Sequence, residues 1–238
     1  PTPQARERYV RYVVARYAGM DVTWQGIAGF EDYEGGRELL REIGTLLRKL
    51  DPYNHPRSTD ALVTSDPLAG DGWMNFIVHR GADVALGAIE HQLQAAPFVN
   101  AGFGVEDAGP AAAAPGGVSV DDLRKRLWTS AMNGQYPTFA NAATYAGAGL
   151  PVDPGQLESP GARQMTVWFD FFSGTRHWEL EPYFDVDGGR ALALEIPRSE
   201  DEPPEGIEYI VYVEKPGPVE IVLQRQNYDV AWLNPITG

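Results

Sequence analysis

The fold is decided by two short stretches of sequence: WQGIAGFE at residues 24–31 and FVNAGFGVE at residues 98–106. In each stretch a short apolar run ends at a glycine, Gly29 in the first and Gly102 in the second, and a glutamate follows within a few residues. This pattern is typical of a buried strand that opens into a polar loop. In barrels of parallel strands, the loops that follow the strands carry the catalytic side chains. The two junctions are therefore the first places to look for a site.

Strands and helices are expected to alternate over the first 178 residues, which implies a parallel α/β arrangement. Apolar residues at helical spacing predict helices at residues 4–18, 39–50, 83–94, 119–131 and 160–173. Short apolar runs between them predict strands at residues 21–25, 61–64, 75–79, 98–101 and 136–141. Ser119 is the expected N-cap of the fourth helix, with Asp122 at its third position.

The pattern changes beyond Trp178. Glycines, prolines and charged residues there separate short β runs at residues 191–196, 207–213, 219–223 and 230–233. We therefore expect residues 1–180 to be a β/α barrel segment and residues 181–238 to be a small antiparallel β-sandwich. About five β/α steps precede the boundary, whereas a closed barrel has eight. The expected fold is the C-terminal part of a (β/α)8 barrel, whose open edges would need strands from an upstream segment or another chain.

Composition excludes several classes of function. The formal net charge of −14 argues against nucleic acid as a partner, since a polyanion would be repelled. No apolar run is long enough for a membrane span. Cysteine is absent, which excludes disulfides and thiolate metal sites, and the four histidines have no ligand spacing. No phosphate or dinucleotide loop is present, so neither a metal nor a cofactor is expected.

Five segments together resemble the apiosidase-like glycoside hydrolases. They are RY at 16–17, VTWQ at 22–25, DPYNHPRS at 51–58, FVNA at 98–101 and WLNPITG at 232–238. Proteins of that group are (β/α)8 barrels followed by a small β-sandwich that is often labelled a collagen-binding domain. The resemblance covers nearly the whole chain, from the helix before barrel strand 4 to the end of the sandwich. It implies that about three β/α units lie upstream of Pro1.

The resemblance also implies where catalytic residues should lie. Members of the group carry an acid/base carboxylate after strand 4 and a nucleophilic carboxylate after strand 7. These positions fall on or near Gly29 and on Gly102, and glycine can perform neither step. The nearest carboxylates, Glu31 and Glu106, are the predicted proton donor and the predicted nucleophile or base. A retaining glycosidase needs its two carboxyls about 5–5.5 Å apart and an inverting one about 6.5–9.5 Å apart, and both outcomes stay open.

Other polar and aromatic side chains near strand ends are candidates for sugar binding. Aromatic rings can stack on sugar faces, and histidine or asparagine can hydrogen-bond a hydroxyl. The predicted substrate-binding residues are Trp24, His55, His79, Tyr136 and Asn141, with Gly29 and Gly102 lining the same pocket.

Three functions follow as hypotheses. The first is hydrolysis of a plant-type or pectic glycan by two carboxylates. The second is a non-catalytic carbohydrate-binding barrel that has lost its carboxylates, and the third is a matrix- or partner-binding protein that acts through the sandwich. The resemblance implies a bacterial protein that is secreted or periplasmic.

Overall fold

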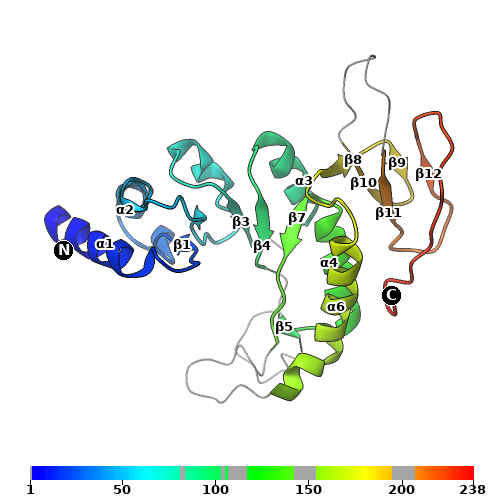
Figure 1. Ribbon diagram of the computed structural model, residues 1–238, viewed down its shortest axis with the longest axis horizontal. Coiled ribbons are helices and arrows are strands. Elements are labelled where there is room, and N and C mark those ends of the chain that lie inside the picture. The colour runs from blue at the N-terminus through cyan, green and yellow to red at the C-terminus, as the bar shows by residue number, and fades with distance from the viewer. Residues whose placement is uncertain (1, 81–83, 103–104, 107–116, 142–153, 195–206) are drawn as a thin grey trace. The chain divides into compact units, whose positions relative to one another are not determined.

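A computed structural model of the chain describes residues 2–80, 84–102, 105–106, 117–141, 154–194 and 207–238 (Figure 1). The chain divides into two compact units. Unit 1 comprises residues 1–83 and 89–102, and unit 2 comprises residues 84–88 and 103–238. Helix α3 (Val84–Leu93) contributes residues to both.

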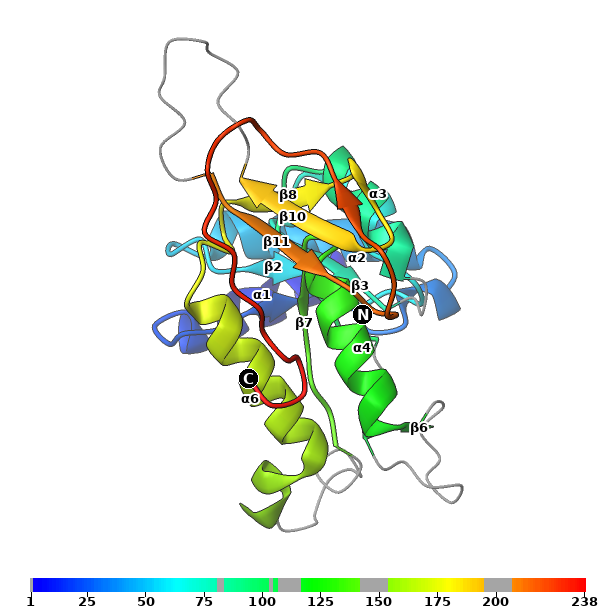
Figure 2. The same ribbon diagram turned by 90° about the vertical axis from the view of Figure 1, so that its right-hand side faces the viewer.

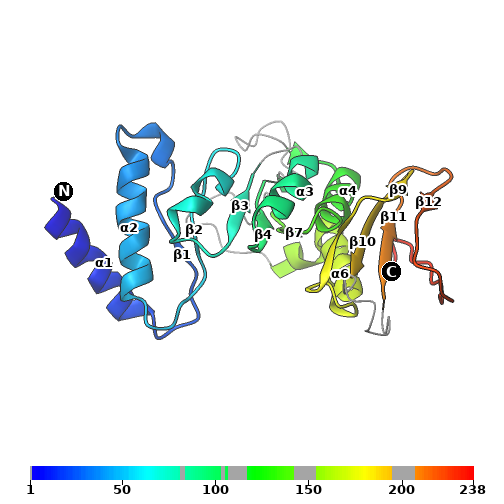
Figure 3. The same ribbon diagram turned by 90° about the horizontal axis from the view of Figure 1, so that it is seen from above.

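Two amphipathic helices form one side of unit 1, as their apolar spacing predicts. Helix α1 (Pro3–Tyr17) begins at Thr2, whose hydroxyl accepts a hydrogen bond from the N–H of Ala5. Helix α2 (Gly36–Leu50) lies beside it (Figure 3). The buried faces of the two helices enclose a small core that also receives the indole of Trp24. Its members are Val10, Val14, Ala18, Trp24 and Leu47.

The strands of unit 1 are parallel, as expected from the alternation of strands and helices. β1 (Trp24–Gln25) pairs with β2 (Arg57–Ser58), and β3 (Ile77–His79) pairs with β4 (Phe98–Asn100). The 3-10 helices η1 (Phe30–Asp32) and η2 (Asp66–Asp71) follow β1 and β2. The predicted strands at 75–79 and 98–101 and the helix at 83–94 are confirmed to within two residues at each end.

The strand predicted at residues 61–64 is wrong. The strand in this part of the chain is β2, four residues earlier, where the N–H of Trp24 donates to Pro56 and that of Gly26 to Ser58. Leu62 and Val63 are instead mostly exposed. Hydropathy misplaced the strand because the residues that β2 buries, Arg57 and Ser58, are polar.

Unit 2 begins with short strands followed by two helices. β5 (Val105–Glu106) pairs with β6 (Gly117–Val118) in parallel, and β7 (Gln135–Pro137) follows helix α4 (Val120–Ala131). The 3-10 helix η3 (Pro154–Glu158) precedes helix α6 (Pro160–Ser173). Serine caps both α-helices. Ser119 accepts from the N–H of Asp122 and Ser159 from that of Ala162, so the predicted cap of α4 is confirmed.

Antiparallel strands form the rest of unit 2 (Figure 2). β8 (Leu180–Tyr183), β10 (Arg190–Leu194) and β11 (Tyr209–Tyr212) form one sheet in the order β11-β10-β8. β9 (Val186–Asp187) pairs with β12 (Glu220–Ile221). No strand forms at residues 230–233, where a fourth β run was predicted, and these residues are exposed. An alternating pattern makes a strand only where another strand supplies hydrogen bonds, and none does so here among the described residues.

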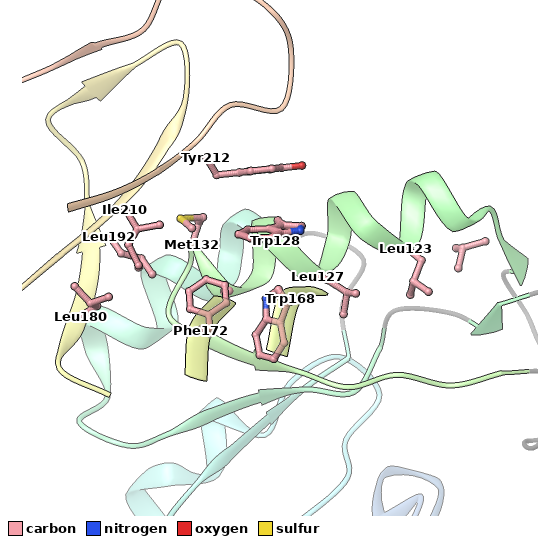
Figure 4. Packing of buried hydrophobic residues seen from close by; sticks show 12 residues of the cluster. Leu123, Leu127, Trp128, Met132, Trp168, Phe172, Leu180, Leu192, Ile210 and Tyr212 are labelled. Atoms are coloured by element: carbon pink, nitrogen blue, oxygen red, sulfur yellow. The ribbon is translucent and has the colours of Figure 1, made fainter. Parts of the chain in front are cut away.

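The largest core of the described residues joins α4 and α6 to the antiparallel sheet (Figure 4). Alternate residues of β10 and β11, such as Leu192 and Tyr212, point from the sheet toward the two helices. The ring of Tyr212 stacks on Trp128, with centroids 5.7 Å apart and planes 15° apart. Phe172 and Trp168 complete the contact from α6. This core extends across residue 180, and the domain boundary expected there stays a prediction.

Gly44, in the middle of α2, has no room for a side chain, because a Cβ there would overlap the buried indole of Trp73. Replacing a helical glycine with alanine normally stabilises a helix by about 1 kcal/mol. For Gly44→Ala we expect the opposite, a loss of about 1–3 kcal/mol from overpacking. Urea unfolding measures the difference. The matched control is Gly70→Ala, whose Cβ would meet nothing within 4 Å, and an unchanged Gly44→Ala protein would contradict the packing described here.

Candidate functional site

Gly29 occupies a turn between β1 and η1 that favours glycine. Its φ is +61°, in the left-handed region, and a Cβ there would approach only the carboxylate of Asp32, at 3.3 Å. Glu31, the predicted proton donor, lies in η1 and is exposed. Its Oε1 accepts the N–H of Leu62 at 3.0 Å. The left-handed backbone conformation thus explains why residue 29 is a glycine. The Glu31 carboxylate that follows is accessible to solvent.

Gly102 follows β4 and has a different reason to be glycine. Its N–H donates to Oδ1 of Asn100 at 3.0 Å, which turns the chain at the end of the strand. A Cβ on Gly102 would overlap the backbone of Arg80, the residue that follows β3. Any side chain at this position would therefore displace the backbone between two neighbouring strand ends.

Glu106, the predicted nucleophile, is completely buried at the end of β5. Three donors converge on its carboxylate. Oε2 accepts from the hydroxyl of Ser159 at 2.7 Å and from the side-chain amide of Asn141 at 3.1 Å, and Oε1 accepts from the N–H of Gly161 at 2.6 Å. The carboxylate thus replaces the lost hydration with charge-assisted hydrogen bonds.

The sequence around α6 explains why Glu106 can lie there. Ser159 is the N-cap and Pro160, which has no N–H, opens the helix, so the N–H of Gly161 is left to donate to Glu106 at the positive end of the helix. A Cβ on Gly161 would come within 2.6 Å of the Glu106 carboxylate. The absence of that side chain admits the carboxylate to the helix start. Glu106 therefore ties β5, the segment at Asn141 and α6 together.

A second buried carboxylate, Asp51, organises the DPYNHPRS segment, which leads into β2 in unit 1. Its side chain accepts from the N–H groups of Tyr53 and His55, from Nδ1 of His55 at 3.0 Å and from Nε1 of Trp24 at 3.1 Å. Burial alone would raise the pKa of the Asp51 carboxyl. The hydrogen bonds from Tyr53, His55 and Trp24 outweigh it and hold that pKa below its ordinary value.

Arg57 extends this network and is itself buried. Its guanidinium donates to the carbonyls of Trp73 and His55 and to Oδ1 of Asn54, which has a positive φ of 57°. Burial lowers the pKa of Arg57, and the charge of Asp51 opposes that effect. The segment leads into β2, so Trp24 and His55 meet at the entering end of the strands. In parallel barrels, conservation at that end is read as stability, and sites lie at the opposite end.

His79 lies at the end of β3 in a layer between the strands and α3. Its side chain lies on the same face of β3 as that of Ile77. Ile77 pairs with Phe98 of β4, and the ring of Phe98 contacts that of His91 on α3. His79 is fully buried, and its Nδ1 lies 2.9 Å from Oε2 of Glu90 on the same helix. The Nε2 of His79 has no hydrogen-bond partner among the described residues. The pair therefore fastens α3 to β3.

The structure brings some predicted residues together and separates others. Trp24 meets His55 through Asp51, and Glu106 meets Asn141, whereas Tyr136 contacts His177 at a 6.2 Å ring separation. Glu31 and His79 instead have other partners in unit 1, the N–H of Leu62 and the carboxylate of Glu90. The roles of these residues in substrate binding or catalysis stay predictions.

Sequence reasoning missed three residues that organise these clusters: Asp51, Glu90 and Ser159. Asp51 had a readable signal, because an aspartate followed by Pro-Tyr is typical of a side chain that accepts from N–H groups two or more residues on. Ser159 before Pro160 is likewise an N-cap signal. Glu90 had none, because its partner His79 is on a different element and only the fold brings them together.

Metal and membrane sites are not found in the described parts of the chain. No three histidine or carboxylate side chains there are grouped to hold a metal ion. In the same residues, no helix combines the length and the apolar character that crossing a bilayer requires.

The lowered pKa of Asp51 predicts a specific pH dependence of stability. A carboxyl whose pKa is lower in the folded state stabilises the protein above its unfolded pKa, near 3.8, and this stabilisation is lost as pH falls through the folded pKa. We expect Asp51→Asn to lose about 1–3 kcal/mol at pH 7, because an amide cannot accept all four donors. The difference from the unmodified protein should shrink below pH 4. Thermal unfolding from pH 3 to 7 measures it, with the exposed Asp21→Asn as control; a constant difference would exclude the linkage.

The two glycines should respond differently to substitution. Gly29→Ala should cost about 1 kcal/mol, the strain of a left-handed alanine. Gly102→Ala should cost more, because it must displace the Arg80 backbone, and Gly102→Glu should cost at least as much. Chemical denaturation of the three variants ranks them. A Gly102→Glu protein as stable as the unmodified chain would instead mean that the position accepts a carboxylate.

No protein-family profile matches the sequence, and no curated protein matches it either. Solved structures do share the fold. One is a glycoside hydrolase family 5 protein from Bacteroides vulgatus, at 14% identity and a TM-score of 0.61, with 95% of this chain and 65% of that one covered. Another, described as a glycoside hydrolase, has 13% identity and a TM-score of 0.61, with coverage of 95% and 66%. This chain thus spans just under two thirds of either. Its mixed α/β fold is similar to that of glycoside hydrolases of the TIM-barrel kind.

Proposed function

We propose that this chain is a glycoside hydrolase-like protein that acts on a plant-type or pectic glycan. The observation that carries the proposal is the likeness of fold to glycoside hydrolases over 95% of the chain. In the finer form of the proposal, the chain is the C-terminal part of a (β/α)8 barrel with a small β-sandwich, as in the apiosidase-like group. The parallel pairing of β1 with β2 and of β3 with β4 supports the barrel part.

Hydrolysis in this proposal uses two carboxylates. Glu31 is the proton donor to the leaving oxygen, and Glu106 is the nucleophile or the base that activates water. The exposure of Glu31 in η1, which follows β1, supports its role, since a proton donor must reach its substrate. Glu106 would have to release the hydroxyl of Ser159 or the amide of Asn141 before it could attack.

Two observations favour a second candidate, a carbohydrate-binding protein without hydrolysis. Glycines stand at or near both positions where the family resemblance places carboxylates. The left-handed backbone favours glycine at 29, and the Arg80 backbone leaves no room for a side chain at 102. Glu106, the nearest substitute after β4, is buried and holds three donors. Such a protein would keep a glycan-binding surface and release no product.

Release of sugar from pectic and arabinofuranosyl oligosaccharides tests the proposal. If the chain hydrolyses them, we expect Glu31→Gln and Glu106→Gln each to lose at least about 100-fold in rate, the usual contribution of a catalytic proton-transfer group. Glu34→Gln, an exposed neighbour of Glu31, should match the unmodified protein. Thermal unfolding of each variant separates lost chemistry from lost structure, because Glu106 also supports α6.

Binding of the same oligosaccharides, measured by calorimetry, separates the two candidates. Binding without release supports the non-catalytic protein. Release that persists in both glutamine variants would remove Glu31 and Glu106 from the reaction. A chain that neither binds nor cleaves any glycan of the panel would overturn the proposal as a whole.

A further inference from the structure

Three aromatic rings of unit 2 form a continuous group at the surface, which we call the aromatic surface: Tyr136, His177 and Trp178. Tyr136 lies in β7, and the other two follow α6. The ring centroids of Tyr136 and His177 are 6.2 Å apart at 77°, and those of His177 and Trp178 are 5.2 Å apart at 79°. Each pair is edge-to-face, so neighbouring rings present differently oriented faces.

The outer two rings are exposed although they are large and apolar. Tyr136 is 41% exposed and Trp178 is 63% exposed. A residue in a strand and a residue in a turn meet here through His177, which also contacts Phe172 at 6.5 Å. A single exposed aromatic residue is common on protein surfaces. A group of exposed aromatic rings in contact with one another is less common.

Hydrogen bonds hold two of the three rings, those of His177 and Trp178. Nδ1 of His177 lies 2.9 Å from the carbonyl oxygen of Phe172, so Nδ1 carries the proton and a neutral ring keeps Nε2 as an acceptor. Nε1 of Trp178 donates to Oε1 of Glu179 at 3.2 Å, and Arg176 pairs with the same carboxylate at 3.4 Å. Rings that are already held by hydrogen bonds in the free protein lose little conformational freedom when a ligand binds.

The aromatic surface lies away from the end of α6 that Glu106 caps. Glu106 contacts the first turn of α6, whereas His177 and Trp178 follow its last. The helix has 14 residues, so its ends are about 21 Å apart. A ligand on the aromatic surface would therefore not contact Glu106 unless it extended over several sugar rings.

We infer that the aromatic surface, which includes the predicted substrate-binding residue Tyr136, is a glycan-binding site separate from Glu106. A sugar ring has an apolar face of C–H groups and a rim of hydroxyls. The C–H face would stack on Trp178 and Tyr136, a hydroxyl would donate to Nε2 of His177, and the Glu179 carboxylate would accept from another. This inference rests on the proposed function for the class of ligand, and it adds a site at which the chain holds a polymer without cleaving it.

Affinity electrophoresis in native gels that contain arabinan, polygalacturonate or xyloglucan tests the inference. Trp178→Ala should weaken retardation at least fivefold on the polysaccharide that binds, and Trp178→Phe should restore most of it by keeping a ring. The matched control is Trp232→Ala, because Trp232 is 91% exposed in the same unit and outside the aromatic surface. Its removal should change nothing.

Fluorine NMR of protein labelled with 5-fluorotryptophan provides a second measurement that does not depend on the fold of a variant. The Trp178 signal, assigned with Trp178→Phe, should shift when an oligosaccharide from the retaining polysaccharide is added, and the Trp232 signal should not. Retardation or hydrolysis without any change at Trp178 would overturn this binding site and leave the proposed function intact. A chain that no polysaccharide retards and that releases no sugar would overturn both.

Discussion

Buried carboxylates that collect donors from separate segments hold the short strands of this protein to their surroundings. The parallel strands are only two or three residues long, so each pair contributes few ladder hydrogen bonds. Asp51 accepts from an indole, an imidazole and two backbone N–H groups, and Glu106 accepts from a hydroxyl, an amide and a helix N-terminus. A buried carboxylate is stable only with such hydrogen-bond donors. Removal of the carboxylate would leave its donors without an acceptor.

This constraint bears directly on function. A catalytic carboxylate needs access to a substrate and freedom to exchange protons, whereas a structural carboxylate needs a full set of donors. Glu106 has the structural environment, and Glu31 has the accessible one. The strand ends that carry Gly29 and Gly102 are also shaped by the backbone, by a left-handed turn in one case and by contact with Arg80 in the other. At these positions the requirements of the backbone oppose those of catalysis. A fold similar to that of glycoside hydrolases therefore does not by itself imply hydrolysis.

The antiparallel strands add a different kind of stabilisation. One face of the sheet β11-β10-β8 packs on α4 and α6 through leucine and isoleucine side chains and through the ring of Tyr212, which stacks on Trp128. The sheet and the two helices share one core, and the rings that follow α6 contact that core through Phe172. The aromatic surface at Tyr136, His177 and Trp178 begins where this core reaches solvent, through the contact of His177 with Phe172.

The sequence by itself determined helices α1, α2, α4 and α6, the Ser119 cap of α4 and the alternation with parallel strands. Apolar spacing locates these helices within about three residues at each end, because an amphipathic stripe is a local feature. Only the tertiary structure decided that β2 replaces the strand expected at 61–64, that residues 230–233 stay unpaired, and which side chains meet. Strand pairing and buried hydrogen bonds join residues far apart in the chain, such as Glu106 with Ser159 and Trp24 with Asp51. The local sequence around a residue does not indicate such distant partners. A carboxylate in a loop, a helix cap or a catalytic site therefore cannot be distinguished from sequence until its partners are known.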